Sequence, residues 1–251
     1  MASPEPSSAQ LAAVRQAEVD ALAGGAHERR LPVEEALAPL LPEGGIRRGT
    51  AVAVGGHGSI TLAVALAAEA SRRGSWVAAV GMADLGVAAL AERGVDLDHW
   101  ALVDLSERGR DRNIAADVLG AVVGGFDLVL VGPAIRVEGA TARGLLARMR
   151  EHGSSVICAL ESASADTAGL RPEVRLMIEQ TRWTGIDNGH GRLLARQAEV
   201  AVGGRGAASR PRRIAMWLPS KDGRVAYADP TQISDFGFGR DFEDVRERRA
   251  G

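Results

Sequence analysis

Short apolar runs alternate with amphipathic or alanine-rich stretches along most of the chain. The continuously apolar runs are typical of strands that are covered on both faces of a sheet. Strands are expected at Thr50–Val54, Trp76–Gly81, Leu102–Leu105, Phe126–Gly132 and Ser155–Leu160, and helices at Leu62–Arg72, Leu85–Arg93, Ile114–Val123 and Thr141–His152. This alternation predicts an α/β fold with a mainly parallel sheet flanked by helices.

The pattern changes after Glu161. Residues 174–182 alternate between apolar and polar side chains, and Asn188-Gly189 and Lys221–Arg224 are tight-turn signals. Further strands are expected at Arg192–Val202, Arg213–Leu218 and Val225–Ala228. These features predict an antiparallel meander that extends one edge of the parallel sheet.

The two ends of the chain differ from this core. Residues 7–23 follow a helical pattern that ends at Gly24-Gly25, and the last residues mix acidic, basic and phenylalanine side chains. We therefore divide the chain into an N-terminal helical extension (1–30), a core domain (31–230) and a flexible C-terminal tail (231–251). The N-terminal helix is expected to pack on the domain or to bind a partner.

Composition excludes several functional classes. The 251 residues carry a formal net charge of −2, which argues against a uniformly basic protein that coats nucleic acid. Cys158 is the only cysteine, so neither an intrachain disulfide nor a cysteine-based metal cluster is expected, and no metal site is predicted. No apolar run reaches transmembrane length and no signal-peptide pattern is present, which predicts a cytoplasmic protein without membrane contact.

A glycine-rich turn links the first long strand to the alanine-rich helix. It contains Gly55, Gly56, Gly58, Ser59 and Thr61. In this strand–loop–helix context a phosphate loop uses backbone N–H groups and a lysine to hold nucleotide phosphates. This turn lacks the lysine and is about two residues too short, and Lys221 is the only lysine in the chain. Residual ATP binding at these five residues stays open, but no cofactor is expected.

A second part of a phosphate-loop ATPase is also missing. The strand Phe126–Gly132 ends in glycine where an acidic residue would hold the metal, and Asp127 lies too early in the strand. Asp84 is either a displaced catalytic acid or, as we favour, a cap of the following helix. His57 has no legible Ser/Asp partner and is interpreted as a loop residue. We therefore predict no catalytic residues and no ATPase activity.

Basic residues cluster late in the chain. Arg205, Arg210, Arg212 and Arg213 lie among glycines between two strands, and they are the candidate nucleic-acid contacts. Arg175, Arg182, Arg192 and Arg196 would share a face with them. Such a stripe, with Trp183 for stacking, suits the phosphates and bases of single-stranded DNA. The alternative is an ordinary solvated sheet edge.

The ordered motifs resemble the RecA core over about residues 31–228. Gly44–Gly49 is similar to its lead-in turn, Gly55–Leu62 holds the Walker A position, Gly94–Asp98 matches a G-V-D-[IL]-D segment, and Phe126–Gly132 takes the Walker B place. The resemblance implies a RecA-like core with a degenerate phosphate loop.

Within that superfamily the chain resembles the ImuA/ImuA′ proteins of the actinobacterial type. The motifs that carry this resemblance are Gly74-Ser75-Trp76, Gly81–Gly86, Arg182-Trp183-x-Gly185, Gly189–Leu193, Gly203–Gly206, Arg212-Arg213 and Trp217-Leu218-Pro219. The resemblance implies a non-catalytic accessory protein of translesion mutagenesis in the SOS response to DNA damage. It implies contact with an ImuB-type Y-family polymerase homologue and, indirectly, with an error-prone C-family polymerase.

Other assignments stay open at this point. A related RecA-like group, the SulA cell-division inhibitors, implies binding of the tubulin-like division protein. A third hypothesis is a RecA-like DNA-binding protein that retains ATP binding. Self-association, or docking on a RecA filament, is a further hypothesis for the N-terminal helix.

Overall fold

The computed structural model describes residues 29–105, 112–136, 139–160, 170–187 and 190–228. The predicted N-terminal helix at residues 7–23 and the predicted tail at 231–251 lie outside the described residues. The division into three regions therefore stays a prediction, and the structure concerns the core domain.

Strands and helices alternate in the first two thirds of the described chain, as the apolar pattern predicts. The elements are β1 (Arg30–Pro32), the 3-10 helix η1 (Glu35–Leu40), β2 (Gly45–Arg47), β3 (Ala51–Gly56), α2 (Ser59–Arg72), β4 (Val77–Val80), α3 (Val87–Glu92), η2 (Leu97–His99), β5 (Trp100–Val103), α4 (Arg112–Gly125), β6 (Leu128–Val131), α5 (Gly139–His152) and β7 (Ser155–Leu160). Then follow β8 (Val174–Asp187), β9 (His190–Gly204), η3 (Gly206–Ala208), β10 (Arg212–Trp217) and β11 (Ala226–Tyr227).

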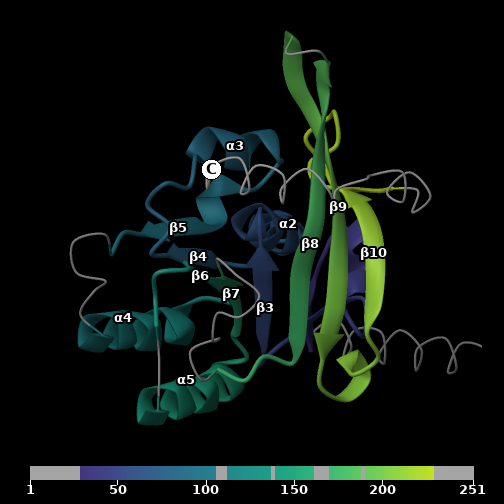
Figure 1. The fold of residues 1–251 in the computed structure, drawn as a ribbon. Coiled ribbons are helices and arrows are strands. Elements are labelled where there is room, and N and C mark those ends of the chain that lie inside the picture. Colours follow the sequence, from purple (N-terminus) through teal and green to yellow (C-terminus); the bar gives the residue numbers. More distant parts are fainter. Residues whose placement is uncertain (1–28, 106–111, 137–138, 161–169, 188–189, 229–251) are drawn as a thin grey trace, which may run out of the picture.

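One large sheet organises the domain. Its nine strands have the order β11-β10-β9-β8-β3-β7-β6-β4-β5, while β1 and β2 form a separate antiparallel pair. The strands from β8 to β5 in this order are parallel, and β8 to β11 are antiparallel to one another (Figure 1). The predicted antiparallel meander at one edge of a parallel sheet is therefore confirmed.

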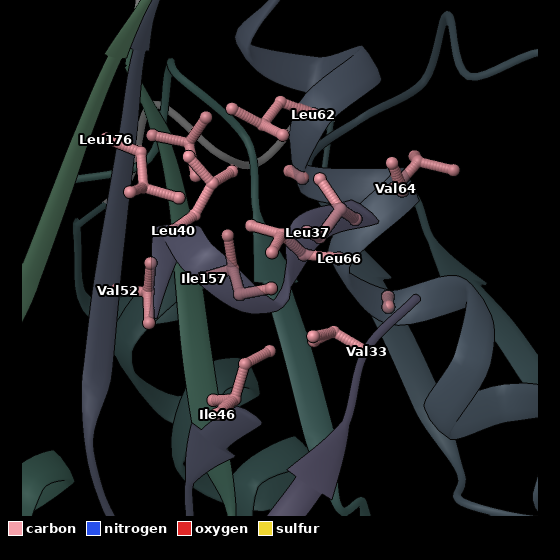
Figure 2. Close-up of a cluster of buried hydrophobic side chains, with 14 of the residues drawn as sticks. Val33, Leu37, Leu40, Ile46, Val52, Leu62, Val64, Leu66, Ile157 and Leu176 are labelled. Carbon is pink, nitrogen blue, oxygen red and sulfur yellow. The ribbon is translucent and has the colours of Figure 1, made fainter. Parts of the chain in front are cut away.

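Helices cover both faces of the parallel strands, and alternate strand residues separate the two layers. Val52 and Val54 of β3 pack with α2 and η1, whereas Ala51 and Ala53 pack with α4 and α5. Figure 2 shows the first layer, in which Leu62 and Leu66 of α2 lie among buried residues of the sheet and η1. Burial of each such leucine stabilises the fold by about 1.5–3 kcal/mol. This two-sided burial explains why the strands are apolar throughout.

The end of α2 is hydrogen-bonded to the segment Gly94–Asp98, which is similar to a RecA G-V-D motif. The Ser71 hydroxyl donates to the Asp96 carbonyl (3.0 Å) and accepts from the Asp96 N–H (3.1 Å). The Asp96 carboxylate accepts from the Asp98 N–H and thereby caps η2. In this protein the segment therefore fixes the connection between α3 and β5.

Strands β8 and β9 extend beyond the rest of the sheet. β8 pairs with β3 only over residues 174–178, and β9 pairs with β10 only over residues 197–202. Among the described strands, residues 180–187 pair only with β9 and residues 190–196 pair only with β8, with irregularities near Gln180 and Gly185. We call this two-stranded extension the arm; it projects past the ends of the parallel strands (Figure 1).

Candidate functional site

The glycine-rich turn lies where β3 ends and α2 begins. Only His57 and Gly58 separate the two elements, so the predicted shortness of the turn is confirmed. Gly56 and Gly58 have positive φ angles of 91° and 100°, which side chains rarely tolerate. His57 is exposed at this turn.

The five residues predicted to hold phosphate do lie together. Gly55 and Ser59 are buried, while Gly56, Gly58 and Thr61 are partly exposed. Gly58 caps α2 without a side-chain hydrogen bond, and the first turn of the helix carries no acidic residue. The free N–H groups and the helix dipole make this end of α2 locally positive.

A buried arginine lies directly against this turn. A Cβ atom added to Gly58 would lie 2.7 Å from Cζ of Arg196, and nearer still to both of its terminal nitrogens. Arg196 is only 4% exposed. The predicted position of Arg196 on a surface stripe is wrong, because β9 turns this side chain inward toward the loop.

The backbone of β10 and its continuation holds Arg196 in place. Its Nε donates to the Leu218 carbonyl (2.7 Å), and its own N–H donates to the Pro219 carbonyl (2.8 Å). The ring of Trp183, its cross-strand neighbour, lies 5.5 Å from Cζ. The buried Nη2 has no hydrogen-bond partner among the described residues. Arg196 is thus a fixed cation with unused donor capacity.

A cavity of about 260 Å³ opens beside Arg196, between α2, α3 and the base of the arm. It is lined by Ile60, Thr61, Val64, Leu85, Gly86, Ala89, Leu90, Arg93, Trp183, Arg196 and Pro219. Burial lowers the pKa of Arg196, and the like charge of Arg93 lowers it further. Burial also lowers the pKa of Arg93, although Glu34 opposes this effect. Burial thus disfavours the charge on both arginines, and Glu34 offsets part of this effect at Arg93. We call this cavity the arginine pocket.

The residue that follows each of the parallel strands β4 and β6 is a glycine, so neither strand end carries a side chain there. β4 is followed by Gly81 and β6 by Gly132, and the Gly132 N–H donates to the Val80 carbonyl (2.9 Å). A Cβ atom on Gly132 would lie 2.8 Å from the Gly81 carbonyl carbon and closer still to its oxygen. Close packing of two backbones thus leaves no room for a carboxylate at residue 132.

The acidic candidates have other positions. Asp127 lies at the opposite end of β6, where it binds Arg48 (2.7 Å) and the Trp76 N–H (2.9 Å). Asp84 is exposed, and the N-cap of α3 is Gly86, so the interpretation of Asp84 as the helix cap is wrong. Helix α3 begins at Val87, two residues later than predicted.

The four arginines predicted to contact nucleic acid do not form one surface. Arg212 and Arg213 are neighbours on a strand, so they point to opposite faces. Arg212 donates to the Pro39 carbonyl (2.8 Å), whereas Arg213 pairs with Glu179 (2.7 Å) and Glu199 (3.2 Å). Arg205 donates to the carbonyls of Arg171 and Pro172. Arg210 is exposed. The predicted stripe is therefore wrong as a single patch.

A different basic groove forms at the start of β3, at the end of the sheet opposite the glycine turn. It has a volume of about 430 Å³. The side chains that line it are Arg47, Arg48, Arg150, Arg171, Arg205, Leu146, Thr50, Ala51 and Glu173, together with Gly49 and Gly206. Arg47 lies 3.8 Å from Glu173 and is largely exposed. We call this the basic groove, and of the four predicted arginines only Arg205 belongs to it.

Large apolar side chains are exposed on the arm. Trp183 is 39% exposed, and Ile186, Leu193 and Leu194 are exposed by 53%, 52% and 45%. Leu193 and Leu194 are consecutive on β9, so they expose apolar surface on both faces of the arm. Exposed apolar surface on a projecting hairpin is typical of a protein-binding element. The apolar residues that flank the Asn188-Gly189 turn signal are the sequence feature that could have predicted this surface.

The remaining chemical candidates are structural. Burial raises the pKa of the Cys158 thiol to about 12, which makes it a weak nucleophile. Among the residues that the structure describes, no group of three or more His, Cys, Asp or Glu side chains could hold a metal ion. No helix within the described ranges is long and apolar enough to cross a membrane.

Parts of the sequence are similar to known proteins. A family model described as the MT3502 N-terminal domain matches residues 39–164. The uncharacterized protein Rv3395c of Mycobacterium tuberculosis is 32% identical over 101 residues, which are 40% of this chain and 47% of that protein. The chain thus spans about half the length of this relative.

Two solved structures share the fold. The RadB recombinase superposes with a TM-score of 0.56 at 17% identity, covering 78% of this chain and 97% of that one. The flagellar accessory protein FlaH from Methanocaldococcus jannaschii gives a TM-score of 0.55 at 12% identity, covering 80% and 99%. The expected RecA-like fold is therefore confirmed.

Proposed function

Because the chain belongs to the MT3502 N-terminal domain family and has a RecA-like fold, we propose that it is a non-hydrolysing accessory protein of DNA damage tolerance. In this role it binds an ImuB-type polymerase homologue and, through it, serves an error-prone polymerase. The RecA-like core then acts as a rigid support for binding surfaces, without ATP turnover.

The observation that carries the proposal is the contact between Arg196 and Gly58. In a phosphate-loop ATPase the phosphates are cradled at the turn before the helix, with a lysine beside them. Here a buried guanidinium packs on that turn. The strand end that would supply the metal-binding acid is closed by the packing of Gly132 on Gly81. Both features favour a loop that supports the fold and does not turn over nucleotide.

The arm favours a protein partner. Among the described residues its two strands have no ladder partners beyond β3 and β10, and Ile186, Leu193 and Leu194 present apolar surface there. A projecting hairpin of this kind suits burial in a groove of the partner or pairing with one of its strands. We assign the contact with the ImuB-type protein to this arm.

A binding experiment with purified full-length protein tests the assignment. The double variant Ile186→Asp with Leu194→Asp places two charges on the arm, whereas Leu102→Asp places one charge on exposed β5 at the opposite edge of the sheet. We expect the arm variant to lose capture of the ImuB-type protein and Leu102→Asp to retain it. Equal capture by all forms would sink the assignment, and failure of the unmodified protein to bind would sink the proposed role.

The same preparation tests the absence of turnover. We expect no phosphate release from MgATP above a buffer blank, with or without single-stranded DNA. Release that depends on protein concentration and persists in fractions across a sizing column would contradict a non-hydrolysing role.

A second activity, contact with single-stranded DNA, is favoured by the basic groove. Five arginines and one glutamate line it, so its net positive charge suits the phosphate backbone of a nucleic acid. Arg47 and Arg150 are exposed there, and the 3.8 Å separation between Arg47 and Glu173 is a loose ion pair that a phosphate can replace. This proposal replaces the predicted stripe of Arg205, Arg210, Arg212 and Arg213 by a groove that shares only Arg205 with it.

Salt-dependent binding of a labelled oligonucleotide checks the groove. Replacement of Arg47 and Arg150 by Gln is expected to weaken binding and to reduce the slope of log K against log salt by about 1.4, or about 0.7 for each lost contact. Arg210→Gln, which removes an exposed charge elsewhere, is the matched control and is expected to leave the slope unchanged. The reverse order of effects would reinstate the β9–β10 arginines.

A further inference from the structure

The arginine pocket holds two arginines, and no carboxylate is present among its described lining residues. Arg93 of the α3 end and Arg196 of β9 both line it, as do Ile60 and Thr61 in the first turn of α2. The N-terminus of that 14-residue helix adds the positive end of its dipole. The cavity thus collects three sources of positive potential from three separate elements.

The hydrogen-bonding state of Arg196 provides independent evidence for a ligand. Arg196 is only 4% exposed, and its Nη2 has no acceptor within the described part of the chain. A buried donor without a partner destabilises the fold, and more strongly when the group is charged. Leu218 and Pro219 hold the guanidinium in place through Nε and the backbone, so the cost persists until an acceptor arrives.

From these contacts we propose that the arginine pocket binds the phosphate group of a small organic phosphate. A planar guanidinium matches two phosphate oxygens, and a second arginine balances the remaining charge of a group that carries about −1.5 to −2 at neutral pH. A carboxylate supplies only one negative charge to two arginines. The phosphate therefore fits the charge balance better.

The rest of the lining describes the organic part of the ligand. Val64, Leu85, Leu90 and Pro219 form apolar walls around the cationic centre. The cavity volume of about 260 Å³ is slightly below the usual range for small-molecule sites. It accommodates a phosphate with one small apolar group. Trp183 lies over the guanidinium, so entry of a ligand changes the environment of its indole. The ligand class is thus a compact phosphate ester.

This site is separate from the proposed partner and DNA surfaces. The arginine pocket lies at the glycine-turn end of β3, whereas the basic groove lies at the start of that strand, and its lining residues are different. It also requires no turnover of nucleotide. Its test can therefore fail while the proposed function holds, and the reverse is equally true.

Isothermal titration calorimetry with the full-length protein provides the test. The probes are phenyl phosphate, inorganic phosphate and benzoate, each at an ionic strength matched with sodium chloride. We expect saturable binding of phenyl phosphate, weaker binding of inorganic phosphate, and a change in tryptophan fluorescence that Trp183→Phe removes. Arg93→Gln is expected to weaken the affinity for phenyl phosphate about tenfold, since it removes one charge-assisted contact.

Two variants keep the result interpretable. Arg210→Gln removes an exposed arginine outside the pocket and is expected to bind like the unmodified protein. Arg196→Lys keeps the buried charge but loses the planar fork, and it is expected to weaken phosphate ester binding while the circular dichroism spectrum is unchanged.

Three results would overturn the proposal. The first is an absence of saturable phosphate binding, and the second is equal weakening by Arg93→Gln and Arg210→Gln. The third is benzoate binding as tightly as phenyl phosphate, which would assign the pocket to carboxylates such as those of an acidic peptide. If Arg196→Lys unfolds, the comparison of Arg93→Gln with Arg210→Gln decides the matter alone.

Discussion

The guanidinium of Arg196 packs on the backbone of Gly58, at a distance that leaves no space for a Cβ atom between them. The two residues are 138 positions apart in sequence and belong to the helix-capping turn and to an antiparallel strand. Their contact joins the parallel and antiparallel halves of the domain beside the arginine pocket. It also sets the first stability prediction.

Gly58→Ala is expected to lower the free energy of unfolding by about 2–6 kcal/mol. A residue other than glycine at φ 100° costs about 1–3 kcal/mol, and the overlap with Arg196 adds about 1–3 kcal/mol of overpacking. Urea denaturation followed by circular dichroism measures the loss.

Gly74→Ala is the matched control for this measurement. Gly74 has a similar φ of 86°, but a Cβ added there would meet no atom within 4 Å. It therefore reports backbone strain alone, and the difference between the two variants isolates the overlap with Arg196. If Gly58→Ala costs no more than Gly74→Ala, Arg196 does not pack on the turn.

Gly132→Asp, which introduces the acidic residue of an ATPase strand end, is expected to destabilise the fold and not to create activity. The new Cβ would overlap the Gly81 carbonyl, and we expect a loss of about 3 kcal/mol or more. Gly203→Asp on β9 is the control, because a Cβ there would meet nothing within 4 Å. Thermal unfolding of both variants gives the comparison; similar melting temperatures would be evidence that the strand end can open.

Arg93→Gln is expected to stabilise the protein slightly when no oxyanion is present. Burial lowers the pKa of Arg93, and Arg93 in turn lowers that of Arg196, so loss of one charge relieves repulsion between them. After allowance for solvent screening, the gain is about 0.5 kcal/mol. Denaturation in a chloride buffer without phosphate or sulfate measures it. A clear loss of stability would instead show that attraction to Glu34 outweighs the repulsion.

Cys158 is expected to resist thiol reagents until the protein unfolds. Burial raises its pKa to about 12 from an ordinary value near 9, although Arg136 and Arg175 oppose the effect. Below pH 9 both folded and unfolded forms keep the proton, and between pH 9 and 12 only the unfolded form loses it. The contribution of this thiol to stability is thus lost as pH rises through that window.

Reaction with 5,5′-dithiobis(2-nitrobenzoate) at pH 8 checks the cysteine prediction. We expect one thiol per chain to react in 6 M guanidinium chloride and almost none in native buffer, with Cys158→Ser as the blank. Fast reaction of the native protein would mean that the strand β7 is more accessible than its packing indicates.

Local patterns along the chain were sufficient for most of the fold. Buried strands such as Ser155–Leu160 must be apolar on both faces, so their sequence alone identifies them and the parallel sheet around them. The Asn-Gly turn signal likewise identified the long antiparallel pair. Boundaries were less certain: α2 begins at Ser59 and not at Leu62, because Gly58 serves as a cap without a side-chain acceptor.

By itself the sequence determined the order of most strands and helices and the shortness of the glycine turn. It also determined that one strand end lacks a lysine and another lacks an acidic residue. Each of these features depends only on residues that are neighbours along the chain. Only the tertiary structure decided where the arginines lie. Strand register turns Arg196 inward onto Gly58, separates Arg212 from Arg213, and brings Arg47, Arg150 and Arg205 into one groove. Charge acts between residues that are near in space, and that proximity is set by pairing and packing over long stretches of chain.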